Sequence, residues 1–162
     1  MGDRQALRRD DLVAAGVTLL GLLAAAGWLE PARGADLGAQ AWNRAAFDTH
    51  SVADAMHALG ILDAKQSKDI AFVQTPEIAE NGAVVPIGIS SNIPKTESIA
   101  IVIDKNPNPL AAVFDVPAGT EPAISTRVKM AQTANIYAVV RADGKYYVAT
   151  KEIKVTLGGC GG

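Results

Sequence analysis

Short runs of alternating apolar and polar residues, separated by turn-forming residues, are the feature that most limits the fold of this chain. The run AISTRVKM, residues 123–130, places Ile124, Val128 and Met130 on one side and polar residues on the other. A period of two residues is typical of a strand with one buried face. The alternation therefore predicts β-structure rather than helix for this part of the chain.

The strongest turn signal joins the last two such runs. Residues 135–141 and 145–157 meet through Asp143-Gly144, and Asp-Gly between alternating segments is typical of a β-hairpin. Five further runs precede this hairpin: 70–74, 84–90, 98–104, 110–116 and 123–130. Seven short strands without helical crossovers predict a mainly β protein, an antiparallel β-sandwich over residues 70–157.

Two of these runs carry signs of local irregularity. Pro86 has no N–H to donate to a neighbouring strand, so it predicts an edge strand or a bulge at residues 84–90. In the last run, the apolar residues move from even positions such as Val148 to odd positions such as Ile153. A shift of one residue predicts a bulge near residues 150–152.

The segment before the strands, residues 36–69, has a helical pattern. Ser51 is a candidate N-cap, with Asp54 in the first turn and Gly60 as the stop. Apolar residues recur at roughly helical spacing at Phe47, Val52, Met56 and Leu59. We predict one short amphipathic helix with a turn before it.

The first 35 residues have the composition of an export signal. Basic residues precede an uncharged run at residues 12–29, and small residues follow it, as in a secretory signal that is cleaved. We expect cleavage after Gly34 or Ala35 and no stable insertion in a membrane. The alternative is a retained anchor, but the run has only 18 residues and is rich in glycine and alanine.

An arginine pair points to the export route. Arg8 and Arg9, followed by Leu12, resemble a twin-arginine signal, although an aspartate stands where that signal favours phenylalanine. We expect the twin-arginine route. Either route ends outside the cytoplasm, in a compartment that permits thiol oxidation.

Charge and cysteine content exclude several classes of function. The net charge is −2, and no basic block of the kind that holds nucleic acid is present. A single cysteine excludes an internal disulfide and a multi-cysteine metal site. His50 and His57 lie seven residues apart, whereas a metal pair on a helix prefers a spacing of four. We therefore expect no metal site, no catalytic residue and no nucleic-acid partner.

The single cysteine, Cys160, lies in the C-terminal sequence LGGCGG. Gly158, Gly159, Gly161 and Gly162 flank it, so no neighbouring side chain in the sequence covers the thiol. Glycine also leaves the backbone with maximal freedom. The sequence therefore predicts a flexible arm that carries an exposed thiol, with a reach of at most about 18 Å for five extended residues.

The thiol of the predicted arm, residues 158–162, has no local activation. The nearest cations in the sequence, Lys151 and Lys154, lie six or more residues back, and the carboxylate of Gly162 opposes ionisation of the thiol. We interpret Cys160 as an attachment point that other active sites activate. The alternative is a secreted structural module that uses Cys160 for an intermolecular disulfide.

Several segments resemble the SoxY family, the sulfur carriers of the thiosulfate-oxidising Sox system. The C-terminal sequence KVTLGGCGG is the most specific of them. Others occur in the order of the family: SVADAMHAL (51–59), PEIAENGAVVPIGI (76–89), KNPNPLAAVF (105–114), ISTRVKM (124–130) and YAVVRADGKYYVATKEIKVT (137–156). The resemblance covers most of the chain after the predicted leader.

The resemblance implies an immunoglobulin-like fold, a periplasmic location and a carrier that is not itself an enzyme and has no cofactor of its own. It implies that Cys160 covalently carries sulfur intermediates. In the family, the haem protein SoxAX couples thiosulfate to the thiol as an S-thiosulfonate, and the manganese-dependent hydrolase SoxB releases sulfate. SoxCD oxidises the remaining sulfur in some organisms, and SoxZ forms a heterodimer with the carrier.

Overall fold

The computed structural model of the protein describes residues 43–157, which form two helices and nine strands. In chain order these elements are α2 Arg44–Phe47, α3 Val52–Ala58, β1 Lys65–Gln66, β2 Ile70–Val73, β3 Ile78–Ala79, β4 Val85–Ser91, β5 Thr96–Ile103, β6 Leu110–Asp115, β7 Ala123–Val128, β8 Ala134–Ala142 and β9 Lys145–Val155. The predicted leader, residues 1–35, and the predicted arm, residues 158–162, lie outside the described residues.

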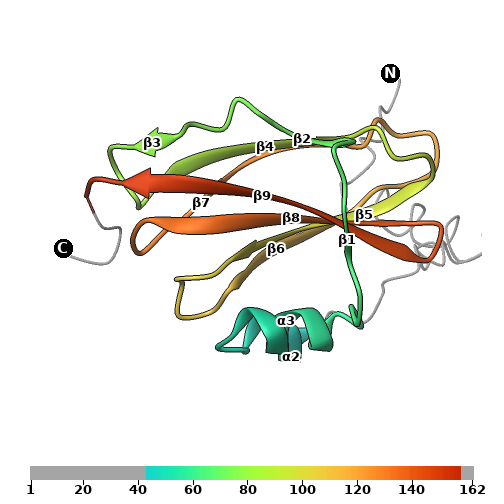
Figure 1. Cartoon of the computed structure of the whole chain (residues 1–162), viewed down its shortest axis with the longest axis horizontal. Coiled ribbons are helices and arrows are strands. Elements are labelled where there is room, and N and C mark those ends of the chain that lie inside the picture. Colours follow the sequence, from blue (N-terminus) through green and yellow to red (C-terminus); the bar gives the residue numbers. More distant parts are fainter. Residues whose placement is uncertain (1–42, 158–162) are drawn as a thin grey trace, which may run out of the picture. The chain divides into compact units, whose positions relative to one another are not determined.

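The strands form two sheets that share one apolar core (Figure 1). One sheet has the order β1-β9-β8-β5-β6, with β3 also paired to β9, and the other has the order β2-β4-β7. The seven longer strands pair antiparallel with one another. The predicted mainly β, immunoglobulin-like sandwich is therefore confirmed, and the seven predicted strands correspond to β2 and to β4 through β9.

The two shortest strands, β1 and β3, are not predicted by the sequence. Both pair in parallel with β9, so that Lys65 lies opposite Tyr147 and Ile78 lies opposite Lys154. Two residues are too few to show an alternating pattern. The sandwich is thus antiparallel except along one side of β9, where β1 and β3 cover what would otherwise be an open edge.

Isoleucine dominates the core between the two sheets. The β4 and β5 residues in this core are at most 1% exposed: Val85, Ile87, Ile89, Ile99, Ile101 and Ile103. β-Branched side chains pack well on a pleated surface, and burying each contributes about 1.5–3 kcal/mol. The inward positions predicted for the alternating run, Val128 and Met130, belong to the same core, so that alternation is confirmed.

A second apolar core lies on the other face of the six-stranded sheet, which α2 and α3 cover (Figure 1). Ala55 of α3 is fully buried and belongs to a cluster with Val102 of β5, Val139 of β8 and Val148 of β9. Both faces of the central strands are therefore buried. This explains the nearly continuous apolar sequence of β5 and β8, because strands that are buried on both faces do not alternate between apolar and polar residues.

The bulge expected at residues 150–152 is wrong. β9 pairs with β8 in an unbroken register along the whole of β8. Val148 belongs to the core beneath the helices, whereas Ile153 belongs to the core between the sheets. The apolar residues change from even to odd positions because successive parts of one regular strand bury opposite faces.

The helical segment contains two helices, where the sequence predicts one helix preceded by a turn. The Ser51 N-cap is confirmed, because its Oγ accepts the Asp54 N–H at 3.0 Å. Gly60, at φ +75°, follows the end of this helix. The preceding turn is the short helix α2, which Asn43 caps by accepting the Ala46 N–H at 3.2 Å.

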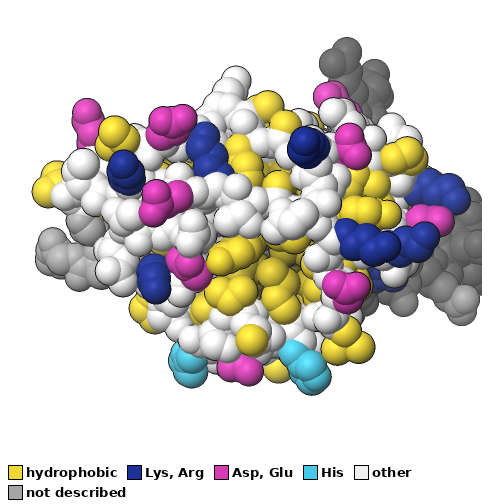
Figure 2. All heavy atoms as spheres, viewed as in Figure 1, with side chains coloured by type: hydrophobic (Ala, Val, Ile, Leu, Met, Phe, Trp, Pro, Cys, Tyr) yellow, Lys and Arg dark blue, Asp and Glu magenta, His cyan; other side chains and the backbone are white. Residues whose placement is uncertain are grey.

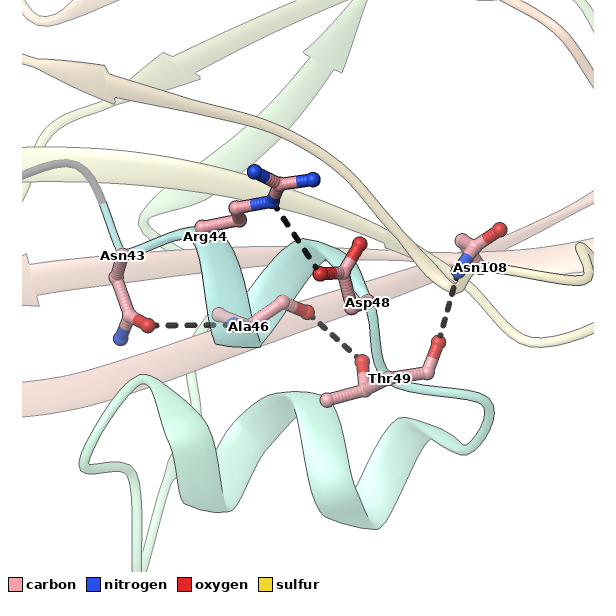
Figure 3. A network of polar contacts seen from close by, with 6 residues as sticks. All are labelled: Asn43, Arg44, Ala46, Asp48, Thr49 and Asn108. Carbon is pink, nitrogen blue, oxygen red and sulfur yellow. Dashed lines mark hydrogen bonds and ion pairs between the residues drawn. The ribbon is translucent and has the colours of Figure 1, made fainter.

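Polar contacts tie α2 to the Asn-Pro-rich turn before β6 (Figure 3). Thr49 Oγ1 donates to the Ala46 carbonyl at 2.8 Å, and Asn108 Nδ2 donates to the Thr49 carbonyl at 3.4 Å. Arg44 and Asp48 form an exposed ion pair at 3.7 Å, which by itself stabilises little. The Asn-Pro-rich turn therefore helps to hold the helices against the sheet.

Pro86 lies in a central strand, so the prediction of an edge strand or a bulge is wrong. β4 lies between β2 and β7, and Pro86 pairs opposite Arg127 without a shift in register. Pairing with β2 reaches only as far as Gly88, whose N–H donates instead to Thr75 Oγ1 at 3.0 Å. Residues two apart in a strand direct their backbone nitrogens to the same side, so the nitrogen of Pro86 faces the same side as the Gly88 N–H. β2 does not extend alongside Pro86, so the missing N–H of the proline breaks no hydrogen bond between strands.

Replacing Gly88 with alanine should destabilise the fold by about 3 kcal/mol, at the upper end for overpacking. The reason is that an added Cβ would lie 2.2 Å from the Val73 carbonyl oxygen. Denaturant titration measures the free energy of unfolding. Ser125→Ala is the matched control, since Ser125 is exposed and lies opposite Gly88; it should change stability by less than about 0.5 kcal/mol. Equal stability of Gly88→Ala and wild type would contradict the close approach of β2 and β4.

Candidate functional site

The candidate site is the end of β9, from which the predicted arm continues. Leu157 is the last residue that the structure describes. On one side, β9 is held by β3, because the Lys154 N–H donates to the Glu77 carbonyl at 2.9 Å and the Thr156 N–H donates to the Ala79 carbonyl at 3.1 Å. The two-residue strand β3 thus holds the backbone of residues 154–156, just before the predicted arm.

Two further hydrogen bonds extend this attachment past the end of β9. The Gly82 N–H donates to the Leu157 carbonyl at 2.9 Å, and Thr156 Oγ1 donates to the Glu80 carbonyl at 3.2 Å. Gly82 in turn accepts the Met130 N–H at 2.7 Å, and Met130 is fully buried. We call residues 77–82 the anchor segment. It connects the strand end to the core of the domain.

The other side of the strand end is held as well. The Val155 N–H donates to Thr133 Oγ1 at 3.0 Å, and Ala134 lies opposite Ile153 in the β8–β9 register. Val155 also packs against the core between the sheets. The strand end is therefore held from both neighbours and from beneath.

The charges near the strand end are mixed. Lys151, one of the two cations nearest to Cys160 in the sequence, donates from Nζ to the Thr75 carbonyl at 2.7 Å, while Lys154 is exposed. Glu77 and Glu80 of the anchor segment are also exposed. Acidic and basic side chains accordingly alternate in the left part of Figure 2 instead of gathering by sign. The described surface has no basic patch here that would attract an anion by itself.

The residues that the sequence assigns to the site lie outside the described residues. They are Cys160, its flanking glycines Gly158, Gly159, Gly161 and Gly162, and the leader pair Arg8 and Arg9. Their assignment therefore stays a prediction. What the structure adds is the attachment of the preceding strand.

His50 and His57 are both exposed, and only His57 lies within α3. Within residues 43–157, no three His, Cys, Asp or Glu side chains gather in a way that would hold a metal ion. In the same range, no helix is long and apolar enough to cross a membrane.

Sequence reasoning misses the anchor segment, which lies between the predicted strands 70–74 and 84–90. The available signal is small. Ile78-Ala79 is a single apolar pair between Pro76 and the turn-forming Asn81-Gly82, and Ile78 is exposed. Only the pairing with β9, distant in the sequence, reveals that this pair is a strand.

The fold and the held strand end define the class of protein: a mainly β, immunoglobulin-like domain whose described part ends at a strand fixed by its neighbours. A search of protein families finds that the family described as "Sulfur oxidation protein SoxY" matches residues 56–160. The match covers more than half of the chain. The chain therefore belongs to the SoxY family.

A solved structure supports this assignment. The sulfur carrier protein SoxY from Chlorobium limicola f thiosulfatophilum is 41% identical, with a TM-score of 0.56, over 63% of this chain and 92% of that chain. An endo-beta-1,4-mannanase from Thermotoga petrophila is 10% identical, with a TM-score of 0.41, over 64% of this chain and 22% of that chain. The human F-spondin reeler domain is 9% identical, with a TM-score of 0.32, over 57% of this chain and 93% of that chain. With TM-scores below 0.5, the last two likenesses say nothing about this chain. A search of curated proteins finds no match.

The backbone amides of Thr156 and Gly82 should exchange with solvent at least about 100-fold more slowly than unprotected amides, because they donate to Ala79 and Leu157. NMR-detected hydrogen exchange measures this directly. Thr133→Val is the matched variant, since it removes the acceptor of Val155 alone and should accelerate that amide most. Exchange of Thr156 and Gly82 at the unprotected rate would mean that the strand end is not held.

Proposed function

We propose that this protein is a covalent carrier of sulfur intermediates in thiosulfate oxidation, and that Cys160 is the attachment point. Family membership carries the proposal: the match to SoxY extends to residue 160, where the single cysteine of the chain stands. The similar structure from Chlorobium limicola f thiosulfatophilum is that of a sulfur carrier protein.

Loading forms a bond between Cys160 Sγ and the outer sulfur of thiosulfate. The thiol loses its proton, and two electrons pass to an oxidant, which the haem groups of the partner SoxAX supply in this proposal. The product is an S-thiosulfonate on Cys160 with a single negative charge. No group on this chain is needed to take up the electrons, so the carrier has no cofactor of its own.

Release is a hydrolysis and needs no further oxidant. Water attacks the sulfonate sulfur, the bond from that sulfur to the sulfane sulfur breaks, and sulfate leaves together with two protons. Cys160 then keeps the sulfane sulfur as a persulfide anion. We assign this hydrolysis to SoxB. Where SoxCD is present, we assign to it the oxidation of the persulfide, after which SoxB hydrolyses the product a second time. The chemistry thus belongs to the partners, and this chain presents the substrate without being an enzyme.

The held strand end suits such a carrier. The glycines Gly158, Gly159, Gly161 and Gly162 form a thin arm, and ordering them in a partner channel costs about 1–2 kcal/mol per residue. Because Leu157 is hydrogen-bonded to the anchor segment, this cost is confined to the arm and does not extend into β9. Tethering also replaces free encounters between small anions and enzymes by a local search.

We further propose that the protein works in the periplasm as a heterodimer with SoxZ. The leader-like composition of residues 1–35, with the pair Arg8-Arg9 as the twin-arginine signal, supports the location. Membership of the SoxY family supports the partner. SoxAX, SoxB and SoxCD would be transient partners. Nucleic acid is not among the proposed partners, since the net charge is −2.

Cys160→Ser should abolish thiosulfate-dependent electron transfer by the reconstituted carrier and its partner enzymes, because no thiol remains to form the adduct. The free energy of unfolding should stay within about 0.5 kcal/mol of the wild-type value, since the glycines on both sides of Cys160 have no side chains that could pack against it. Ser125→Ala, on exposed β7, serves as the control with full activity. Activity that survives in Cys160→Ser would contradict the carrier function, and a large loss of stability would contradict the separation of arm and domain.

A further inference from the structure

The strand β7 ends the three-stranded sheet, so one of its sides pairs with no strand of residues 43–157 (Figure 1). The other sheet edges are covered, short or irregular. β1 and β3 cover β9, β2 has only four residues, and the register of β6 with β5 shifts at Ile101 and Val102. Short edge strands and bulges discourage pairing with another chain. β7, by contrast, has six residues, contains no proline and keeps an unbroken register with β4.

The open side of β7 presents the backbone groups of Ser125 and Arg127. The Ser91 N–H donates to the Pro122 carbonyl at 2.9 Å, so even-numbered residues of this stretch face β4. Backbone groups alternate in direction along a strand, so the N–H and C=O of the odd-numbered residues point away from β4. Ser125 and Arg127 are both exposed, and we call them the open edge residues.

The ends of this open side are already partly paired within the chain. The Ala123 N–H donates to the Glu121 carbonyl at 2.8 Å. At the other end, Asn106 Nδ2 donates to the Lys129 carbonyl at 2.7 Å, and Asn106 Oδ1 accepts the Ala131 N–H at 3.0 Å. The open edge residues between these ends therefore keep both of their backbone groups available for a further strand.

The open edge residues are complementary to themselves in an antiparallel pair. When Ser125 of one copy lies opposite Arg127 of a second copy, the two residues exchange two hydrogen bonds. A two-fold axis repeats this pair with the copies interchanged. Two residues with two groups each, in two copies, thus form four hydrogen bonds and leave none of these groups unpaired.

The charges along β7 favour this antiparallel arrangement. Glu121 precedes the strand, whereas Arg127 and Lys129 lie at and just beyond its end, and all three side chains are exposed. Antiparallel pairing places the start of one strand beside the end of the other, so Glu121 of each copy comes near Lys129 of the other copy. A register with Arg127 opposite itself would place like charges face to face, which is unfavourable.

We propose that the protein self-associates through β7, whose antiparallel pairing with β7 of a second copy joins the two three-stranded sheets into one. The occupant of the open edge is thus another copy of this chain. The inference concerns the β-sandwich and does not rest on the carrier function. A contact between two strands is small compared with a standard protein interface, so we expect a weak dimer that depends on protein concentration.

Hydrogen exchange within β7 tests the pairing without any substitution. The amides of Ser125 and Arg127 should exchange at least about tenfold more slowly at high protein concentration than at low concentration. NMR spectra recorded with a reducing agent measure this while preventing disulfides. Thr126 is the internal control, because its amide faces β4 and should exchange slowly at both concentrations. Exchange of Ser125 and Arg127 that does not depend on concentration would overturn the proposal.

Sedimentation equilibrium of Ser125→Pro and Ser125→Ala separates the backbone from the side chain. Proline removes a donor that faces away from β4, so pairing within the sheet stays intact, whereas alanine keeps this donor. We expect Ser125→Pro to raise the dissociation constant of the dimer at least about tenfold, through loss of two of the four hydrogen bonds. Ser125→Ala should keep the wild-type constant. A wild type that is monomeric at every concentration, or equal constants for Ser125→Pro and wild type, would contradict the pairing.

A charge exchange tests the register with the backbone unchanged. Lys129→Glu should weaken the dimer about fivefold, because like charges then meet at both ends of the paired strands. Lys129→Glu/Glu121→Lys should restore the wild-type constant, and a double variant as weak as the single one would rule out the register. A carrier that is monomeric alone, and whose binding to SoxZ is weakened by Ser125→Pro, would assign the edge to that partner and overturn self-association.

Discussion

Parallel pairing between β3 and the end of β9 is the interaction on which the functional interpretation depends. It consists of a few backbone hydrogen bonds, from Lys154 to Glu77, from Thr156 to Ala79 and from Gly82 to Leu157. None of them is strong by itself, since a hydrogen bond contributes about 0.5–1.5 kcal/mol net. Together they join the strand end to a segment whose Gly82 carbonyl accepts the N–H of buried Met130. The described chain is therefore attached to the core up to Leu157.

The rigidity of β9 upstream of that point comes from two apolar cores. Val148 packs beneath the helices and Ile153 packs between the sheets, so the strand cannot shift toward either face without opening a core. The helices α2 and α3 are thus part of the support of the site, although they lie away from the strand end (Figure 1). For the proposed carrier function, this arrangement offers a partner a preorganised surface, which lowers the ordering cost of binding.

Much of the fold could be predicted from the sequence, since alternation identifies the seven longer strands and the Ser51 N-cap identifies α3. Two errors have a common cause: a strand pattern does not state what lies on either face or at either edge. The position of Val148 therefore suggests a bulge, whereas the residue belongs to a second core in a regular strand. Pro86 suggests an edge strand, whereas β4 is central and only the pairing with β2 stops before Pro86. For the site, LGGCGG predicts the attachment residue from composition alone. The anchor segment could not be predicted, because its two-residue strand is defined by a partner more than 70 residues later.

The intact mass of the protein from thiosulfate-grown cells tests the central claim most directly. With Cys160 as the carrier thiol, the spectrum should contain monomer with additions of sulfane sulfur or of a thiosulfonate group, and a reducing agent should remove them. Fragmentation should place every such addition on Cys160, the single cysteine of the chain. A spectrum with only bare monomer and a disulfide-linked dimer that reduces to bare monomer would contradict the account and favour a crosslinked structural module.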